Sequence, residues 1–297
     1  MIARERGFLL LTSRLGDPHR KPLTVAQMRN LAQRVRAADW VEQDRELNQA
    51  DLIACGYSHQ MAAHILMLLS QEDQLEYYLQ KGKKAGCVPL TRVNENYPAA
   101  VRKRLGDDSP GVLWVKGDIA LLRSPLIALV GSRDLNTTNR DFAMRVGEEA
   151  AIQGFTLVSG NARGADRTAQ EACLSSGGKV ICVTAEALAK HAANENILSV
   201  AEDDYDMPFS SVRALSRNRV IHALAQKTFV AQARLGHGGT WDGTLRNLRG
   251  SWNSVFCFDD GSDAARELSQ LGAEMIKTEQ LTNIDALQSK HITMFDQ

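Results

Sequence analysis

The sequence predicts an α/β fold: a doubly wound, mostly parallel sheet that follows a small, all-helical N-terminal domain. Up to residue 80 the apolar side chains recur at helical spacing, whereas from Gly86 onward short apolar runs alternate with helical stretches, as in a parallel sheet with crossover helices. A length of 297 residues with 44% apolar side chains suits one sizeable core and one smaller unit. We therefore expect a helical domain over residues 1–84 and a sheet domain over residues 85–297.

The helical region carries recognisable start and stop signals. Thr24 is the expected N-cap of an amphipathic helix whose apolar side chains share one face: Val25, Met28, Leu31 and Val35. Further along, Gly56 suits the end of one helix and Ser58 the N-cap of the next. Short helices joined by such tight turns predict a small helical bundle.

The sheet region is read from apolar runs and the helical patterns between them. Strands are predicted at 87–90, 112–115, 126–130, 156–158, 180–183, 228–231 and 254–258. Helices are predicted at 138–153, 164–176, 212–225, 240–249 and 263–271. Residues 186–209, rich in alanine, asparagine and acidic side chains, are expected to form an irregular insert without a strand.

Composition excludes several classes of protein. No run approaches the roughly 18 apolar residues of a membrane helix, and the N-terminal apolar run is too short for a signal peptide. The five cysteines are an odd number and form no CxxC pair, which argues against a disulfide framework and a zinc site. We expect a cytoplasmic protein with no membrane contact, no metal and no cofactor.

The formal net charge of zero hides an uneven distribution. Basic side chains greatly outnumber acidic ones over residues 81–104 and again over 213–249, whereas acidic side chains outnumber basic ones over residues 37–80. A ligand interacts with the local charge of the face that it binds and not with the net charge of the protein. A net charge of zero is therefore compatible with an anionic partner. The alternative is that these segments are ordinary solvated faces.

Candidate binding residues follow the predicted strands, because open α/β sheets bind ligands beyond the carboxyl ends of their strands. After 126–130 come Gly131, Ser132 and Arg133, which offer a close backbone approach, a hydroxyl and a guanidinium fork matched to phosphate. The alternative for such an arginine is an ion pair with a surface carboxylate. After 156–158 a second glycine turn opens a helix, whose first amides favour an anion; its candidates are Ser159, Gly160, Arg163 and Gly164.

A third glycine turn follows the strand at 228–231, with Gly238, Gly239 and Thr240 as candidates. Three anion-friendly loops at one sheet edge predict a shared phosphate site. The basic segment adds Arg217, Asn218 and Arg219; because arginines two apart point to different sides of a helix, only one of the two is expected to contact ligand. Asp166, near the start of the second helix, is expected to have a structural role, and His237 a hydrogen bond to the ligand or the loop backbone.

Five motifs in register resemble the DprA/Smf family of DNA-processing proteins. They are YP at 97–98, VKGD at 115–118, VGSR at 130–133, SGxAxGxD at 159–166 and RNRxI at 217–221. The resemblance implies an extended Rossmann domain behind a SAM-like, helix-hairpin-helix-type N-terminal domain. It also implies binding of single-stranded DNA, a homodimer, and loading of a RecA-type recombinase during DNA recombination or DNA-mediated transformation.

The chain departs from the family pattern at several places. Gln170 stands where the family has a histidine, and Gln232 where it has a glutamate. Leu215 and Ser216 replace the Phe-Pro before RNR, the segment 192–209 is shortened and altered, and we expect no C-terminal winged-helix domain. These departures leave the expected fold and phosphate loops unchanged, but they argue against assuming that the chain loads a recombinase. A divergent accessory or defence role is the alternative.

Three functions are compatible with the sequence. The first is a non-enzymatic single-stranded DNA-binding protein, with Phe209 and Trp241 as the nearest candidates for base stacking. The second is a nucleotide-binding sensor or phosphoribohydrolase-like enzyme, since residues 238–240 resemble the glycine loop of the related lonely-guy branch; Asp242 would then have to supply the carboxylate. The third is a pure assembly module. No nucleophile and base can be paired, so we assign no catalytic residue.

Overall fold

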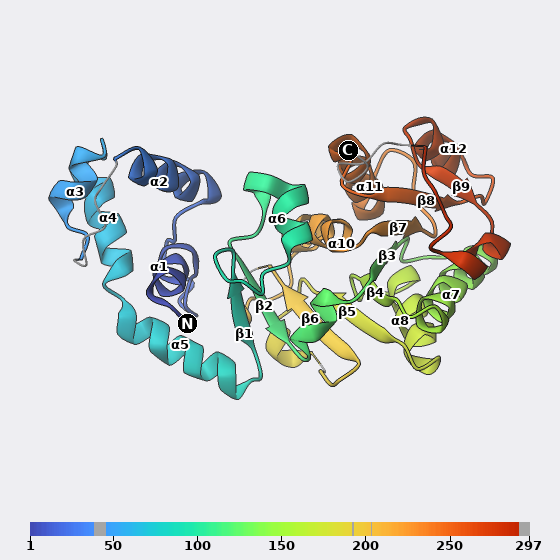
Figure 1. Cartoon of the computed structure of the whole chain (residues 1–297), viewed down its shortest axis with the longest axis horizontal. Helices are drawn as coiled ribbons and strands as arrows, with labels where there is room; N and C mark the ends of the chain where they lie inside the picture. The colour runs from blue at the N-terminus through green and yellow to red at the C-terminus, as the bar shows by residue number, and fades with distance from the viewer. Residues whose placement is uncertain (39–45, 192, 203, 291–297) are drawn as a thin grey trace.

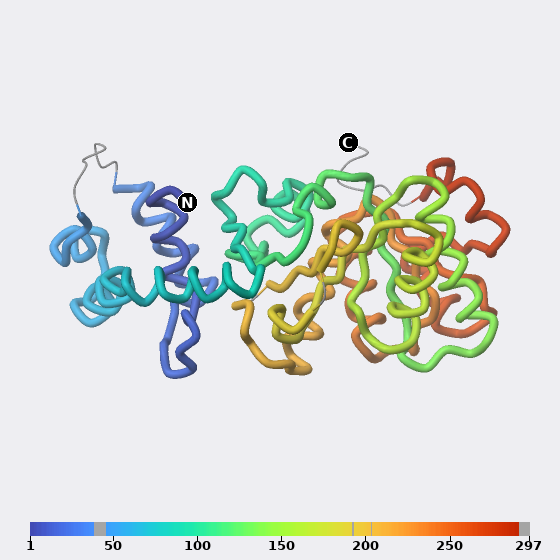
Figure 2. Tube along the Cα trace, turned by 90° about the horizontal axis from the view of Figure 1, so that it is seen from below, coloured from blue at the N-terminus to red at the C-terminus, as the bar shows by residue number. Residues whose placement is uncertain are grey.

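The computed structural model describes residues 1–38, 46–191, 193–202 and 204–290. Helices gather at one end of the molecule and a sheet with its covering helices lies at the other (Figure 1). Before the first strand, the described residues form α1 (Ala3–Thr12), α2 (Val25–Ala37), α3 (Gln49–Ala54), α4 (His59–Leu69) and α5 (Glu72–Lys84). In Figure 2, α5 runs from this helical end toward the sheet.

Capping residues set the helix boundaries as the sequence predicts. Thr24 Oγ1 accepts the amide of Gln27 at 3.3 Å, and the Gln27 side chain accepts the amide of Thr24 at 2.8 Å, which closes a capping box on α2. Gly56 adopts a φ of +84°, which ends α3, and Ser58 Oγ accepts the Met61 amide at 3.2 Å to begin α4. These helices enclose a core of their own: Leu11, Leu23, Leu31, Leu52, Ala62, Ile65 and Leu68.

The helical end packs directly against the edge of the sheet. Tyr78 of α5 lies 5.6 Å from Trp114 and 4.6 Å from Tyr205, measured between ring centroids. Leu9 and Leu10 of α1 join the same buried cluster. Apolar contact therefore continues across the domain boundary proposed at residue 84, so the helices are seated on the sheet domain and not tethered beside it.

Within the described residues the sheet has nine strands in the order β1-β2-β6-β5-β4-β3-β7-β8-β9. The strands are β1 (Val88–Thr91), β2 (Val112–Lys116), β3 (Leu126–Val130), β4 (Thr156–Ser159), β5 (Lys179–Val183), β6 (Ile197–Ala201), β7 (Lys227–Val230), β8 (Ser254–Phe258) and β9 (Glu274–Ile276). Only the β1–β2 and β2–β6 pairings of these strands are antiparallel. The predicted doubly wound, mostly parallel sheet is confirmed.

Helices cover both faces of this sheet. One core cluster lies under α6 (Ala99–Leu105), α10 (Asn218–Leu224), α11 (Gly239–Gly250) and α12 (Asp263–Gln270), and another under α7 (Thr137–Ile152) and α8 (Ala165–Ser175). The strand order reverses at β3, which pairs with β4 on one side and β7 on the other. A reversal of this kind opens a crevice beyond the carboxyl ends of the strands.

The structure corrects two predictions of secondary structure and shows elements that the sequence did not predict. Residues 186–209 were expected to lack a strand, yet β6 lies there, because Leu198 and Val200 are fully buried between β5 and β2. The single helix expected at 212–225 is divided into α9 (Ser211–Ser216) and α10, with Arg217 at the break. The strand β9 was not predicted. Among the described residues, no helix combines the length and apolar character needed to cross a membrane.

Candidate functional site

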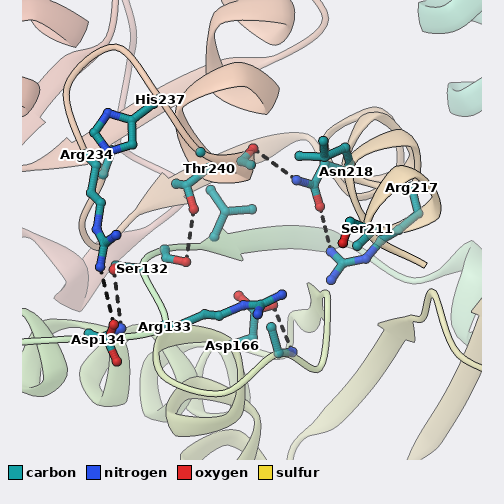
Figure 3. Close-up of a pocket in the computed structure, with 18 residues that line it drawn as sticks. Ser132, Arg133, Asp134, Asp166, Ser211, Arg217, Asn218, Arg234, His237 and Thr240 are labelled. Atoms are coloured by element: carbon teal, nitrogen blue, oxygen red, sulfur yellow. Dashed lines mark hydrogen bonds and ion pairs between the residues drawn. The ribbon is translucent and has the colours of Figure 1, made fainter. Parts of the chain in front are cut away.

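A pocket of about 370 Å³ opens where the sheet reverses, beyond the carboxyl ends of β3 and β7 (Figure 3). The loops after β3, β4 and β7 meet here with helix α9 and the break before α10. The lining residues are Val130, Gly131, Ser132, Arg133, Asp134, Ala162, Asp166, Ser211, Ala214, Leu215, Arg217, Asn218, Ala233, Arg234, His237, Gly238, Gly239 and Thr240.

The loop after β3 is held by backbone contacts to its neighbours. Ser132 donates its amide to the Gln232 carbonyl at 2.9 Å and accepts the Ala165 amide at 3.1 Å. Thr240 Oγ1 donates to the Gly131 carbonyl at 3.0 Å. A Cβ on Gly131 would fall 2.4 Å from the Cβ of Ala165, so only glycine allows this close packing. Main-chain bonds thus fix the loop without using its charged side chains.

Arg133 points into the pocket toward Asp166 (Figure 3). Its side chain is exposed, and within the described part of the chain no hydrogen bond or ion pair holds its guanidinium group. Its positive charge also lowers the pKa of Asp166, although burial is the larger effect and raises it. Arg133 is therefore a cation that a ligand can reach.

Arg217 forms the floor of the pocket and is 7% exposed. It donates to the Gly160 carbonyl at 2.8 Å and to Asn218 Oδ1 at 2.7 Å, and Asn218 donates to the Gly239 carbonyl at 3.0 Å. Burial lowers the pKa of Arg217, and the charge of Asp166 opposes that shift. The arginine thus joins the loop after β4 to the start of α11 and keeps a positive charge beneath the pocket.

Asp166 has the structural role that the sequence predicts. Its carboxylate accepts the amides of Gly160 at 3.1 Å and Ala162 at 3.2 Å, which closes the loop after β4. Burial raises its pKa, while Arg217 and the two amides lower it. Although Asp166 borders the pocket, its charge is already shared with groups of the protein.

Some candidate residues support the pocket without lining it. Ser159 is fully buried and accepts a hydrogen bond from Gln170 Nε2 at 2.6 Å. Gly160 lies behind Arg217, and Gly164, at a φ of +86°, packs so closely that a Cβ would fall 2.4 Å from the Arg133 carbonyl oxygen. These residues therefore contribute to the predicted site by fixing the backbone of its loops, and none of them presents a side chain to a ligand.

Two further candidates do not line the pocket. Arg219 pairs with Glu202 at 2.9 Å and donates to the Asp108 carbonyl, so of the two arginines left open by the sequence it is Arg217 that lines the pocket. Arg163 lies outside the lining and pairs with Asp134 at 2.7 Å. Both arginines thus form an ion pair with a carboxylate, which is the alternative role that the sequence left open for an arginine of the predicted site.

Sequence reasoning missed Asp134 and Arg234, whose side chains form an ion pair of 3.3 Å at the mouth of the pocket. Their positions after β3 and β7 were a usable signal, because every lining loop follows a strand. Trp241, predicted as a stacking candidate, is 6% exposed and belongs to the core, so a ligand cannot reach it. His237 Nδ1 lies 3.0 Å from the Leu235 carbonyl oxygen, within its own loop.

The fold and the pocket define a class: a Rossmann-like α/β protein with an arginine-floored, glycine-lined pocket at the point where its strand order reverses. Within that class, the family model described as DNA recombination-mediator protein A matches residues 89–283. The chain belongs to this family, as the motifs in its sequence predict.

Curated relatives agree with this assignment. The chain is 27% identical to protein Smf of Escherichia coli over 69% of its own length and 56% of the relative's. It is 29% identical to DNA processing protein DprA of Streptococcus pneumoniae over 58% of its length and 66% of the relative's. The chain thus matches less than two thirds of the length of each of these proteins.

Solved structures show the same fold. The crystal structure of DNA processing protein A from Streptococcus pneumoniae superposes with a TM-score of 0.72 at 23% identity, covering 94% of this chain and 96% of that one. DNA processing protein A from Helicobacter pylori, whose structure describes a single-stranded DNA binding mode, gives a TM-score of 0.57 at 25% identity, covering 66% of this chain and 94% of that one.

Proposed function

We propose that this chain is a non-enzymatic protein of DNA processing that binds single-stranded DNA and holds its backbone phosphates in the pocket at the sheet reversal. The observation that carries this proposal is Arg133, an exposed guanidinium without an ion-pair partner among the described residues, above the buried charge of Arg217. A guanidinium fork matches a phosphate in shape and charge. Family membership and the DNA-binding relative from Helicobacter pylori support the proposal.

The lining favours contact with the nucleic-acid backbone over reading of bases. Gly131, Gly238 and Gly239 present main chain only, and the cationic groups suit any phosphate regardless of sequence. Binding should therefore be nearly sequence-blind and should weaken with salt, by a log-log slope of about 0.7 per neutralised phosphate of a single strand.

Exposed apolar side chains in the lining and in the segments next to it favour a strand over a free mononucleotide. Leu215 lines the pocket and is 49% exposed, and Leu235, in the loop after β7, is 48% exposed. Phe209, two residues before the lining residue Ser211, is 52% exposed. Unpaired bases stack and pack on such side chains, whereas in a duplex they are covered by each other. We propose Phe209 as the stacking residue.

Each carboxylate near the pocket is already engaged or lies outside it. Asp134 lines the pocket but pairs with Arg163 and Arg234, and Asp166 is buried against two backbone amides. Asp242 is exposed on α11 but does not line the pocket. Cleavage of a glycosidic bond needs a carboxyl group free to stabilise the ribose or to activate water. Binding without base release is therefore the proposed activity.

Family membership also suggests an oligomeric state, a cellular location and a protein partner for this chain. We propose a cytoplasmic homodimer that passes its strand to a RecA-type recombinase. Sedimentation of the purified chain tests the dimer, and pull-down of a recombinase by the chain with and without oligonucleotide tests the partner. A monomer at micromolar concentration would remove the dimer from the proposal.

Fluorescence anisotropy with labelled oligothymidylate at two salt concentrations tests the main proposal. Arg133→Ala should weaken binding about tenfold and flatten the salt dependence by one phosphate contact. Arg123→Ala is the matched control, an exposed arginine that precedes β3 at its amino end, and should bind as the unmodified chain does. Equal loss in both variants would contradict the proposal. Release of free base from nucleoside monophosphates would favour the hydrolase.

A further inference from the structure

One carboxylate holds two arginines at the mouth of the pocket. Asp134 Oδ1 lies 2.7 Å from Arg163 Nη2, and Asp134 Oδ2 lies 3.3 Å from Arg234 Nη2. The three side chains come from the loops after β3, β4 and β7, so they converge from three separate strands (Figure 3 shows the Asp134–Arg234 pair). The group is open to solvent: the side chains of Asp134, Arg163 and Arg234 are 63%, 75% and 60% exposed.

These ion pairs are not needed to hold the loops together. Main-chain bonds already join the same segments, from the Ser132 amide to the Gln232 carbonyl at 2.9 Å and from the Ala165 amide to the Ser132 carbonyl at 3.1 Å. Exposed ion pairs contribute little to stability, because water and salt screen them. The carboxylate can therefore leave the two arginines at small cost.

The arrangement has the shape of an occupied anion site. Each carboxylate oxygen takes one guanidinium group, as the two non-bridging oxygens of a phosphodiester would. Asp134 directly follows Arg133, so this position lies beside the proposed phosphate contact in the pocket. Consecutive phosphates of one strand require neighbouring cationic positions of this kind.

We propose that Arg163 and Arg234 form a second phosphodiester position at the pocket mouth, which Asp134 occupies until single-stranded DNA displaces it. This inference rests on the proposed function and adds to it the residue that sets affinity. Asp134 acts as a built-in competitor of the strand. A strand that binds the two arginines must first break their ion pairs with Asp134. Each arginine therefore adds little net binding free energy while the carboxylate is present.

A double-mutant cycle tests this proposal with the full chain and labelled oligothymidylate. Asp134→Asn should raise affinity about fivefold, since it removes the competing charge and keeps the side-chain shape. Arg163→Gln should change affinity less than twofold in the otherwise unmodified chain, but should lower it about fivefold in the Asp134→Asn background, where the arginine is free. Unchanged urea unfolding of Asp134→Asn would exclude a merely structural origin of the change.

The control for long-range charge is Asp242→Asn, an exposed carboxylate in the first turn of α11 that does not line the pocket. Equal effects of Asp134→Asn and Asp242→Asn, or the same factor for Arg163→Gln in both backgrounds, would overturn the proposal. Normal binding that still depends on Arg133 would then leave the proposed function intact. Absence of any oligothymidylate binding would overturn both.

Discussion

Gly160→Ala tests whether the buried arginine organises the pocket floor. A Cβ at this position would lie 1.9 Å from Arg217 Nη1 and 2.2 Å from Cζ. Because heavy atoms in contact keep about 3.5 Å apart, the guanidinium group must move by about 1.5 Å. That movement breaks its 2.8 Å hydrogen bond to the Gly160 carbonyl, and at 7% exposure the group cannot readily turn to water.

A hydrogen bond to a charged group contributes about 1.5–3 kcal/mol, and the lower backbone entropy of alanine in the unfolded chain offsets about 0.4–1 kcal/mol. The free energy of unfolding in urea should therefore fall by about 1–2 kcal/mol, and oligothymidylate affinity should fall with it. Gly7→Ala in α1 is the matched control, because no atom lies within 4 Å of the place its methyl group would take and a helical alanine should stabilise. A Gly160→Ala chain as stable as the control would refute the role given to Arg217.

Two further predictions concern buried or paired side chains. Burial lowers the pKa of His222 from 6.5 to about 3. Between these pH values the imidazole is protonated in the unfolded chain but neutral in the folded one. The free energy of unfolding should therefore fall by about 1.4 kcal/mol per pH unit as the pH drops from 6.5 toward 3. Chemical denaturation at several pH values should show a weaker acid dependence in His222→Gln, and an identical dependence would contradict this account. Arg219→Gln removes the guanidinium group that pairs with the nearly buried Glu202 at 2.9 Å, so the free energy of unfolding should fall by about 1–3 kcal/mol while oligothymidylate affinity stays unchanged. A loss of affinity without a loss of stability would return Arg219 to the binding site.

Much of the fold could be predicted because its signals are local. The strands at 126–130 and 254–258 are apolar runs bounded by turn residues, and the structure places both at the predicted bounds. The strand β6 was missed because its short run ILSVA lies in a segment of polar and small residues, and it pairs with β2, a strand about 85 residues earlier in the chain. Non-local pairing of this kind overrides weak local preference.

The site likewise contains residues that the sequence predicts and residues that only the fold reveals. The positions of Gly131, Arg133 and Gly239 follow from the rule that ligand loops come after parallel strands, and the structure brings these residues to one pocket. The choice between Arg217 and Arg219 could not be made, because it depends on a helix break that no proline or glycine marks. The pair of Asp134 and Arg234 joins residues one hundred positions apart, so only the folded chain reveals it.

A crystal structure of the chain with bound single-stranded oligothymidylate would show directly whether the phosphates of the strand lie in the pocket. We expect a phosphate group within hydrogen-bond distance of the Arg133 guanidinium, between the loops after β3 and β7, with bases against Phe209 or Leu215. A strand that lies elsewhere, on the helical end of the molecule or on the opposite edge of the sheet, would contradict the proposed function.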